Sequence, residues 1–167
     1  DKIEREIQHA EAGTPAKIII KVNSIVEEQS IQALYRASQA GVEIKLIVRG
    51  DCCLKPGIPG ISENIEVRSI IGRFLEHTRI YAFKNCGEYE IYGSSADLMN
   101  RNMFRRVETC FPIENKKLHD RVLHDLECYL KDNTQAWLLQ SDGSYLKFER
   151  NGQEPFQVQT KLLAELG

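Results

Sequence analysis

The spacing of hydrophobic residues changes several times along the first third of the chain, and each change predicts a new element. Apolar residues at helical spacing predict a helix over residues 2–12, which Gly13 closes. A run of β-branched residues predicts a buried strand over 16–22, and a second strand is expected over 42–48 after an intervening helix. A strand–helix–strand unit favours parallel neighbouring strands joined by a right-handed crossover.

The helix between these strands carries start and stop signals. Asn23 or Ser24 can act as its N-cap, because a short polar side chain can accept hydrogen bonds from the first free backbone N–H groups of the helix. The helix is expected to run to about residue 40 and to end at Gly41, since glycine tolerates the left-handed backbone common after a helix.

The rest of the chain predicts a loop, more strands and two more helices. Prolines and glycines make 50–62 a loop. Strands are expected at residues 65–71, 79–83, 90–92, 107–113, 136–139 and 145–148, and helices at 115–130 and 160–166. The predicted fold class is therefore α/β, with a mixed β-sheet flanked by helices and residues 1–167 as a single domain.

Composition narrows the class of protein. Five cysteines without regular spacing or a C-x-x-C pair argue against a disulfide framework and a structural zinc site, and we expect no metal site in this chain. Reduced thiols fit the cytoplasm. No apolar run approaches the ~20 residues that span a bilayer, and no secretory signal is visible. The chain starts at Asp1 without a Met, so we expect a piece of a longer protein.

Charge is unevenly distributed along the chain. The net charge is −2, which does not indicate a generally basic nucleic-acid binder. From Arg68 to Arg106, however, the chain has seven basic residues and four acidic ones, which gives this segment a net charge of +3. Six of these seven are arginines, whose forked guanidinium suits phosphate oxygens. The alternative is that these basic residues form a solvent-exposed surface without a ligand.

Two arginines and one histidine are the first candidates for phosphate chemistry. Arg49 followed by Gly50 ends a predicted buried strand, and ligands of open α/β sheets bind at the carboxyl ends of strands. His77 and Arg79 are two residues apart, so on a strand both would project from one face. A histidine beside an arginine stays more neutral, which suits a general base or a donor to phosphate. The alternatives are that Arg49 forms a surface salt bridge and that His77 has only a structural role.

Two later segments add to this pattern. Residues 93–102 follow a strand and offer small residues whose N–H groups can face an anion. Arg106 and Glu108 would share a strand face, although an arginine beside a carboxylate is often only a structural pair. The order of these parts resembles one half of the phospholipase D superfold: a His-x-basic pair, a hairpin, Gly-Ser-x-x-Asp-x-x-x-Arg-Asn, and a strand bearing Glu. In that superfamily two such halves face each other, and each contributes a histidine.

The closer resemblance is to the C-terminal region of the bacterial polyphosphate kinase family, and it covers nearly the whole chain. The matching motifs include Leu46-Ile47-Val48-Arg49-Gly50, Cys52-Cys53-Leu54, Pro56-Gly57-Ile58-Pro59-Gly60, Val67-Arg68-Ser69-Ile70-Ile71-Gly72-Arg73-Phe74-Leu75-Glu76-His77, Ser95-Ala96-Asp97, Arg101-Asn102 and Arg105-Arg106-Val107-Glu108. The departures are Leu98 in place of Trp and Met99-Asn100 in place of Met-Pro. They concern loop packing more than phosphate-facing residues.

The resemblance implies a function and a set of roles. The family moves the terminal phosphate between ATP and polyphosphate through a phosphohistidine, which lies in a preceding domain together with most of the Mg²⁺ site. The resemblance implies that Arg49, His77, Arg79 and Arg106 bind ATP or polyphosphate. It also implies that His77, Arg106 and Glu108 are catalytic, with Glu108 orienting the partner histidine. This chain alone should be inactive.

Partners, location and alternatives follow from the same resemblance. Expected partners are ATP or ADP, inorganic polyphosphate, the preceding catalytic domain and further copies of the full-length enzyme, but no nucleic acid. The expected location is the cytoplasm, including the inner face of the membrane. His9, His119 and His124 are assigned structural or surface roles. One alternative is a non-catalytic polyanion-binding or assembly module. Another is a phosphodiesterase formed by a homodimer. Arg79 argues against this alternative, because those enzymes have a Lys at the corresponding position.

Overall fold

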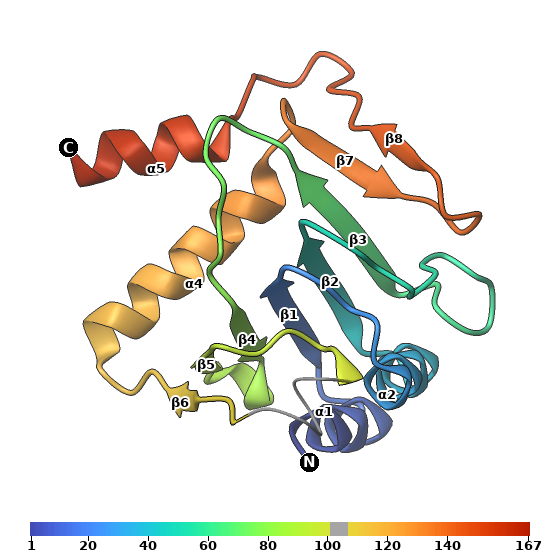
Figure 1. Ribbon diagram of the computed structural model, residues 1–167. Coiled ribbons are helices and arrows are strands. Elements are labelled where there is room, and N and C mark those ends of the chain that lie inside the picture. Colours follow the sequence, from blue (N-terminus) through green and yellow to red (C-terminus); the bar gives the residue numbers. More distant parts are fainter. Residues whose placement is uncertain (101–106) are drawn as a thin grey trace.

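Short runs rich in Ile and Val form the centre of one mixed sheet, because β-branched side chains pack well on a pleated surface. The computed structural model describes residues 1–100 and 107–167. Its strands are β1 (Lys17–Val22), β2 (Glu43–Val48), β3 (Ile65–Ile70), β4 (Ile80–Phe83), β5 (Glu90–Ser94), β6 (Cys110–Pro112), β7 (Ala136–Leu139) and β8 (Tyr145–Lys147). In the described part of the chain they form an eight-stranded sheet in the order β6-β5-β4-β1-β2-β3-β7-β8 (Figure 1).

The parallel part of the sheet is its centre. β1 pairs with β2 and β2 with β3 in parallel register, whereas β4 runs antiparallel to β1 and β7 antiparallel to β3. The predicted parallel pair of the first two strands is therefore confirmed, and so is the mixed sheet. A 3-10 turn, η1 (Asn85–Gly87), joins β4 to β5 where the sequence predicted a turn.

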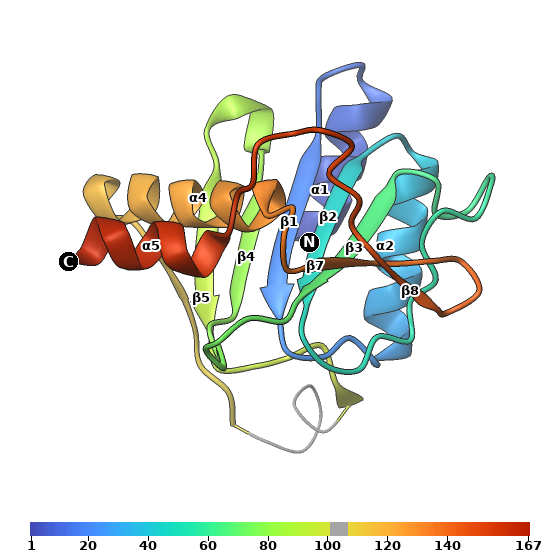
Figure 2. The same cartoon turned by 90° about the horizontal axis from the view of Figure 1, so that it is seen from above.

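Helices cover both faces of the sheet (Figure 2). Their bounds are α1 (Lys2–Glu11), α2 (Glu28–Gln39), α4 (Lys116–Lys131) and α5 (Val158–Leu166). Because side chains alternate along a strand, Ile18 and Ile20 pack with residues of α1 and α2, while Ile19 packs with α4 and α5. Within the described ranges, no helix combines the length and the apolar character needed to cross a membrane.

The predicted start of α2 is wrong. Glu27 is its N-cap, and the Glu27 carboxylate accepts hydrogen bonds from the backbone N–H groups of Gln29 at 2.9 Å and Ser30 at 2.7 Å. Asn23 and Ser24 are instead held at the end of β1, where their own N–H groups donate to a buried carboxylate. The long-range bonds therefore move the helix start several residues along the chain.

Two strand boundaries also differ from the sequence-based prediction. β4 begins at Ile80 and not at residue 79, and β6 begins at Cys110, so that Val107 and Glu108 precede the strand. Val107 is fully exposed, which removes the burial that would favour a strand there. The remaining predicted elements are confirmed with shifts of a few residues at their ends.

One edge of the sheet gathers the segments that the sequence singled out. The parallel strands β1, β2 and β3 end there, β4 begins there, and the antiparallel order places the end of β5 and the start of β6 beside them. In Figure 2 the ends of β1 and β2 point to the lower side, where the connection into β4 also lies. We call this side the carboxyl edge. It comprises Asn23, Arg49, Gly72–Arg79, Ser94–Leu98 and Glu108.

Candidate functional site at the carboxyl edge

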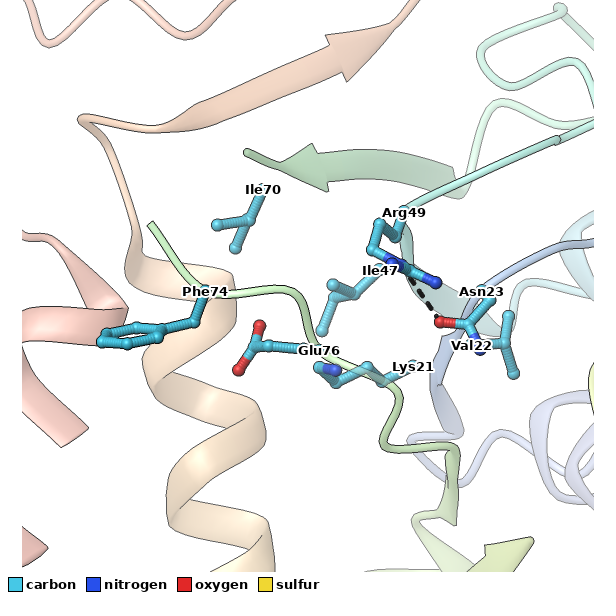
Figure 3. A pocket seen from close by; sticks show the side chains of 8 residues that line it. All are labelled: Lys21, Val22, Asn23, Ile47, Arg49, Ile70, Phe74 and Glu76. Atoms are coloured by element: carbon cyan, nitrogen blue, oxygen red, sulfur yellow. Dashed lines mark hydrogen bonds between the residues drawn. The ribbon is translucent and has the colours of Figure 1, made fainter. Parts of the chain in front are cut away.

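A small cavity lies at the carboxyl edge between β1, β2 and the segment that leads into β4. Its volume is about 20 Å³, room for roughly one water molecule. It is lined by Lys21, Val22, Asn23, Ile47, Arg49, Ile70, Phe74 and Glu76 (Figure 3).

Arg49 stands where β2 ends. Its Nε donates a hydrogen bond to Asn23 Oδ1 at 3.2 Å, drawn in Figure 3, and this bond fixes the direction of the side chain. Gly50 lets the ends of β1 and β2 approach, because a Cβ there would lie 2.9 Å from the carbonyl oxygen of Asn23. Within residues 1–100 and 107–167, the two terminal guanidinium nitrogens of Arg49 have no hydrogen-bond or ion-pair partner.

His77 lies in the connection between β3 and β4, three residues before β4 begins. The prediction that His77 and Arg79 project from one strand face is therefore wrong. The start of the connection is tied to a helix, since Gln159 of α5 exchanges two hydrogen bonds with the backbone of Phe74. The His77 side chain is exposed and makes no hydrogen bond to a residue that the structure describes, so it can meet a ligand.

Arg79 is paired with a buried carboxylate. Its Nη2 donates to Asp97 Oδ2 at 3.2 Å, and its Nε lies 3.0 Å from Asp97 Oδ1. Asp97 is 5% exposed and also accepts the backbone N–H groups of Asn23 at 2.7 Å and Ser24 at 3.3 Å. This carboxylate therefore joins the ends of β1 and β5 to the start of β4. The phosphate-binding role of Arg79 stays a prediction, but its charge is already balanced.

The structural role of Asp97 can be tested by substitution. Asp97→Ala should lower the free energy of unfolding by about 3 kcal/mol, because it leaves two backbone donors unpaired and Arg79 without its carboxylate. Asp97→Asn should cost less, since one acceptor oxygen remains. Urea unfolding of both variants measures the difference. Equal stability of Asp97→Ala and the unchanged protein would contradict this role.

Glu108 is held at the other side of the edge. The Ser95 hydroxyl donates to Glu108 Oε2, and Ser95 Oγ accepts the backbone N–H of Thr109 at 3.0 Å. Glu108 lines a groove between the sheet and helices α1 and α2, whereas Arg49 lines the small cavity on the side of α4. The predicted site residues thus share one edge but not one cavity. Arg106, together with the motif residues 101, 102 and 105, lies outside the described residues.

Sequence reasoning missed Lys21. The residue is only 6% exposed, because its side chain projects from β1 toward α4. Burial lowers the pKa of its ammonium group, and the opposing effect of the Glu76 carboxylate offsets this lowering only in part. A lysine inside the run Ile18–Val22 of strand-forming residues was the signal that could have found it, because buried lysines are rare unless they are paired.

Among residues 1–100 and 107–167, the three side chains whose ligand atoms lie close enough together to share a metal ion are away from this edge. His124 and Asp125 of α4 and Glu165 of α5 have ligand atoms within 4.8 Å of one another. Glu165 is already paired with Arg121 at 3.2 Å and Lys161 at 3.2 Å, which places two cations where a metal would bind. The cluster is a surface ion-pair network that connects the two helices.

Comparisons with known proteins place this chain among the polyphosphate kinases. A family model described as polyphosphate kinase C-terminal domain 2 matches residues 1–159. The polyphosphate kinase of Pseudomonas aeruginosa is 59% identical over 167 residues, covering 99% of this chain and 24% of the relative. The polyphosphate kinase of Neisseria meningitidis serogroup C is 53% identical over 169 residues, covering 100% of this chain and 25% of the relative. The chain thus spans about a quarter of these relatives.

Solved structures agree with both the family and the fold. The crystal structure of polyphosphate kinase from Porphyromonas gingivalis matches with a TM-score of 0.95 and 39% identity, over 99% of this chain and 25% of that chain. Nuc from Salmonella typhimurium, a phospholipase D family member, matches with a TM-score of 0.57 and 16% identity, over 81% of this chain and 89% of that chain. The second match concerns the fold alone, and it confirms the predicted phospholipase-D-like half. The chain belongs to the polyphosphate kinase C-terminal domain family.

Proposed function

We propose that this chain supplies one half of the active site of a polyphosphate kinase, which transfers the terminal phosphate of ATP to polyphosphate reversibly. The observation that carries the proposal is the placement of Arg49 and His77 at the carboxyl edge with side chains that no described residue engages fully. Ligands of open α/β sheets bind at this edge. The other half, including the phosphorylated histidine, would come from a preceding domain.

Phosphoryl transfer needs charge stabilisation and positioning more than covalent chemistry from these side chains. The transferred group spreads negative charge over its oxygens in a loose transition state. Arg49, with Nε already fixed on Asn23, can aim its two terminal nitrogens at these oxygens. His77 would donate a proton or hydrogen bond to the attacking or leaving phosphate oxygen. Arg106 is proposed to add a second guanidinium, as the family resemblance implies.

The remaining proposed residues have supporting roles. Glu108 would accept the N–H of the partner histidine and hold its imidazole in one tautomer, as carboxylates do in catalytic triads. The bond from Ser95 fixes the Glu108 carboxylate in advance. Arg79 is proposed to bind phosphate on the family resemblance alone, because Asp97 already pairs with its guanidinium group.

Mg²⁺ is the proposed cofactor, bound mainly by the preceding domain. The carboxylates at the carboxyl edge would not form a complete Mg²⁺ site by themselves, and they fit a secondary role in Mg²⁺ binding better. Asp97 is engaged by Arg79 and two backbone N–H groups, and Glu108 is engaged by Ser95. Bound Mg²⁺ would neutralise charge between the phosphates of the nucleotide.

The isolated domain is expected to show no kinase chemistry. Incubation with γ-labelled ATP and Mg²⁺ should leave it unlabelled, because the nucleophilic histidine is proposed to lie elsewhere. It should also form no polyphosphate. Acid-labile label on any of its four histidines would contradict the proposal.

Partners and location follow from the proposed activity. ATP or ADP and polyphosphate would bind at the carboxyl edge, and the preceding domain would face it. Further copies of the full-length enzyme and a position in the cytoplasm, including the inner membrane face, are proposed on the family resemblance alone. A polyanion-binding module without catalysis would bind polyphosphate in a salt-sensitive manner, yet leave catalysis unchanged on substitution of His77.

A further inference from the structure

The segment that carries His77 has no strand or helix of its own to hold it. Residues 71–79 connect β3 to β4, and the side chains of Leu75 and His77 are exposed. A histidine that acts on a phosphate oxygen must nevertheless be held close to its working position, because small misplacements cost large factors in rate. The bonds that fix this segment therefore bear on catalysis.

The start of the segment is anchored to α5. Phe74 N donates to Gln159 Oε1 at 3.0 Å, and Gln159 Nε2 donates to Phe74 O at 2.9 Å. Gly72 makes this approach possible, because a Cβ there would lie 2.3 Å from Gln159 Oε1. Gln159 is 6% exposed, so water competes little for these bonds.

The end of the segment is anchored by a second cluster, on both sides of His77. Glu76 accepts a hydrogen bond from the hydroxyl of Tyr129 in α4. Lys21 of β1 donates to the carbonyl oxygen of Thr78 at 3.4 Å, and its ammonium lies 4.9 Å from the centre of the Tyr129 ring. The two chain neighbours of His77 are thus each held by a member of this cluster. Figure 3 shows Lys21 and Glu76 at the wall of the small cavity, near Arg49.

A lysine beside the ring of Tyr129 is energetically less favourable than an apolar side chain that fills the same space. Burying an ammonium costs free energy that an apolar side chain would not require. The cost is partly offset by the ring of Tyr129, the carbonyl of Thr78 and the charge of Glu76. Packing alone gives no reason to keep Lys21, which points to a role in placing the residues that it touches.

We propose that Lys21, Glu76 and Tyr129 form a positioning cluster that fixes His77 for phosphoryl transfer. The inference rests on the proposed function, because it assumes that His77 acts at the phosphate. None of the three residues needs to touch the substrate. They act through the backbone on either side of His77 and connect it to β1 and α4.

The test uses a complete polyphosphate kinase that carries this domain, with Lys21→Met as the main variant. We expect kcat to fall about 10- to 100-fold with KM for ATP nearly unchanged, because misplacement of His77 affects the transition state. The midpoint of thermal unfolding should stay the same or rise, since the buried charge is removed. A kcat within twofold of the unchanged enzyme would overturn the inference.

Lys45→Met is the matched control. Lys45 lies on the neighbouring strand β2, two residues before Ile47, which pairs with Lys21, and so projects from the same face. Its ammonium is paired with Glu66 at 3.3 Å, toward the opposite edge of the sheet. The control should retain kcat within about twofold. An equal loss in both variants would show a general effect of lysine removal and contradict positioning.

A double substitution separates positioning from a purely structural role. If Lys21 acts through His77, Lys21→Met should lower kcat little further once His77 is alanine. Two losses that multiply would overturn the inference while leaving the role of His77 intact. If instead His77→Ala alone has no effect, the proposed function itself fails.

Tyr129→Phe keeps the inference testable should Lys21→Met not fold. It removes only the hydroxyl that holds Glu76 and retains the ring below Lys21. We expect a smaller loss of kcat, about 3- to 10-fold, with no loss in the His77→Ala background. Unchanged kcat in a folded Tyr129→Phe enzyme would contradict the cluster.

Discussion

Replacing His77 by alanine in a complete kinase is expected to lower kcat by ~10²–10⁴-fold, the usual effect of losing a positioned acid–base group. The side chain is exposed at the carboxyl edge, so removing it opens no buried cavity and should leave folding intact. The histidine that we propose to be phosphorylated, in the other half, should remain chemically unaltered. Steady-state kcat and KM for ATP are the quantities to measure.

His124→Ala is a suitable control for this variant. His124 is also exposed, but it lies on α4 and contacts Glu165 of α5, away from the carboxyl edge. Its removal should leave kcat within about twofold. If His77→Ala instead retained a near-normal kcat with only a raised KM, His77 would be a binding residue and not an acid–base group.

Arg49→Ala is expected to give the second large effect, a loss of ~10²–10³-fold in kcat/KM, as found when one preorganised donor to a transition-state oxygen is removed. Arg49→Lys should not restore full activity. An ammonium has no planar fork, and it cannot both keep the bond to Asn23 Oδ1 and direct two further donors outward.

Arg36→Ala separates this effect from a general loss of positive charge. Arg36 is an exposed arginine of α2 that pairs with Glu4 at 2.6 Å. Its substitution should change kcat/KM by less than about twofold, since exposed pairs contribute little. Full activity of Arg49→Lys would contradict the proposed role of the Arg49 fork. So would a loss of kcat/KM in Arg36→Ala equal to that in Arg49→Ala.

The fold could be predicted from local patterns because those patterns are strong in this chain. Ile18–Ile20 are β-branched, neighbouring helices show clear periodicity, and Gly41 ends α2 where expected. Such features depend on the residues next to them. The pairing of β7 with β3 and of β6 with β5 joins segments that are far apart in the chain, and no local pattern encodes it.

The candidate site was predicted only in part for the same reason. Arg49 stands at a strand end as expected, because strand ends are visible in the sequence. His77 does not lie on a strand, since Gln159, 85 residues after Phe74, holds the preceding segment against α5. Asn23 does not cap α2, because its Oδ1 accepts the hydrogen bond of Arg49 Nε, 26 residues later, while its backbone N–H donates to Asp97. In each case a distant partner outweighs the local preference.

In the proposed function, this domain completes an active site whose other half lies in a preceding domain. The most direct measurement is polyphosphate formation from ATP by three preparations: the intact kinase, the same protein without this domain, and the truncated protein with this domain added separately. We expect activity for the intact kinase and none for the truncated protein. We also expect partial recovery on addition of the domain, and no recovery when the added domain carries His77→Ala. Polyphosphate formation by the truncated protein at the rate of the intact enzyme would show that this domain does not complete the active site.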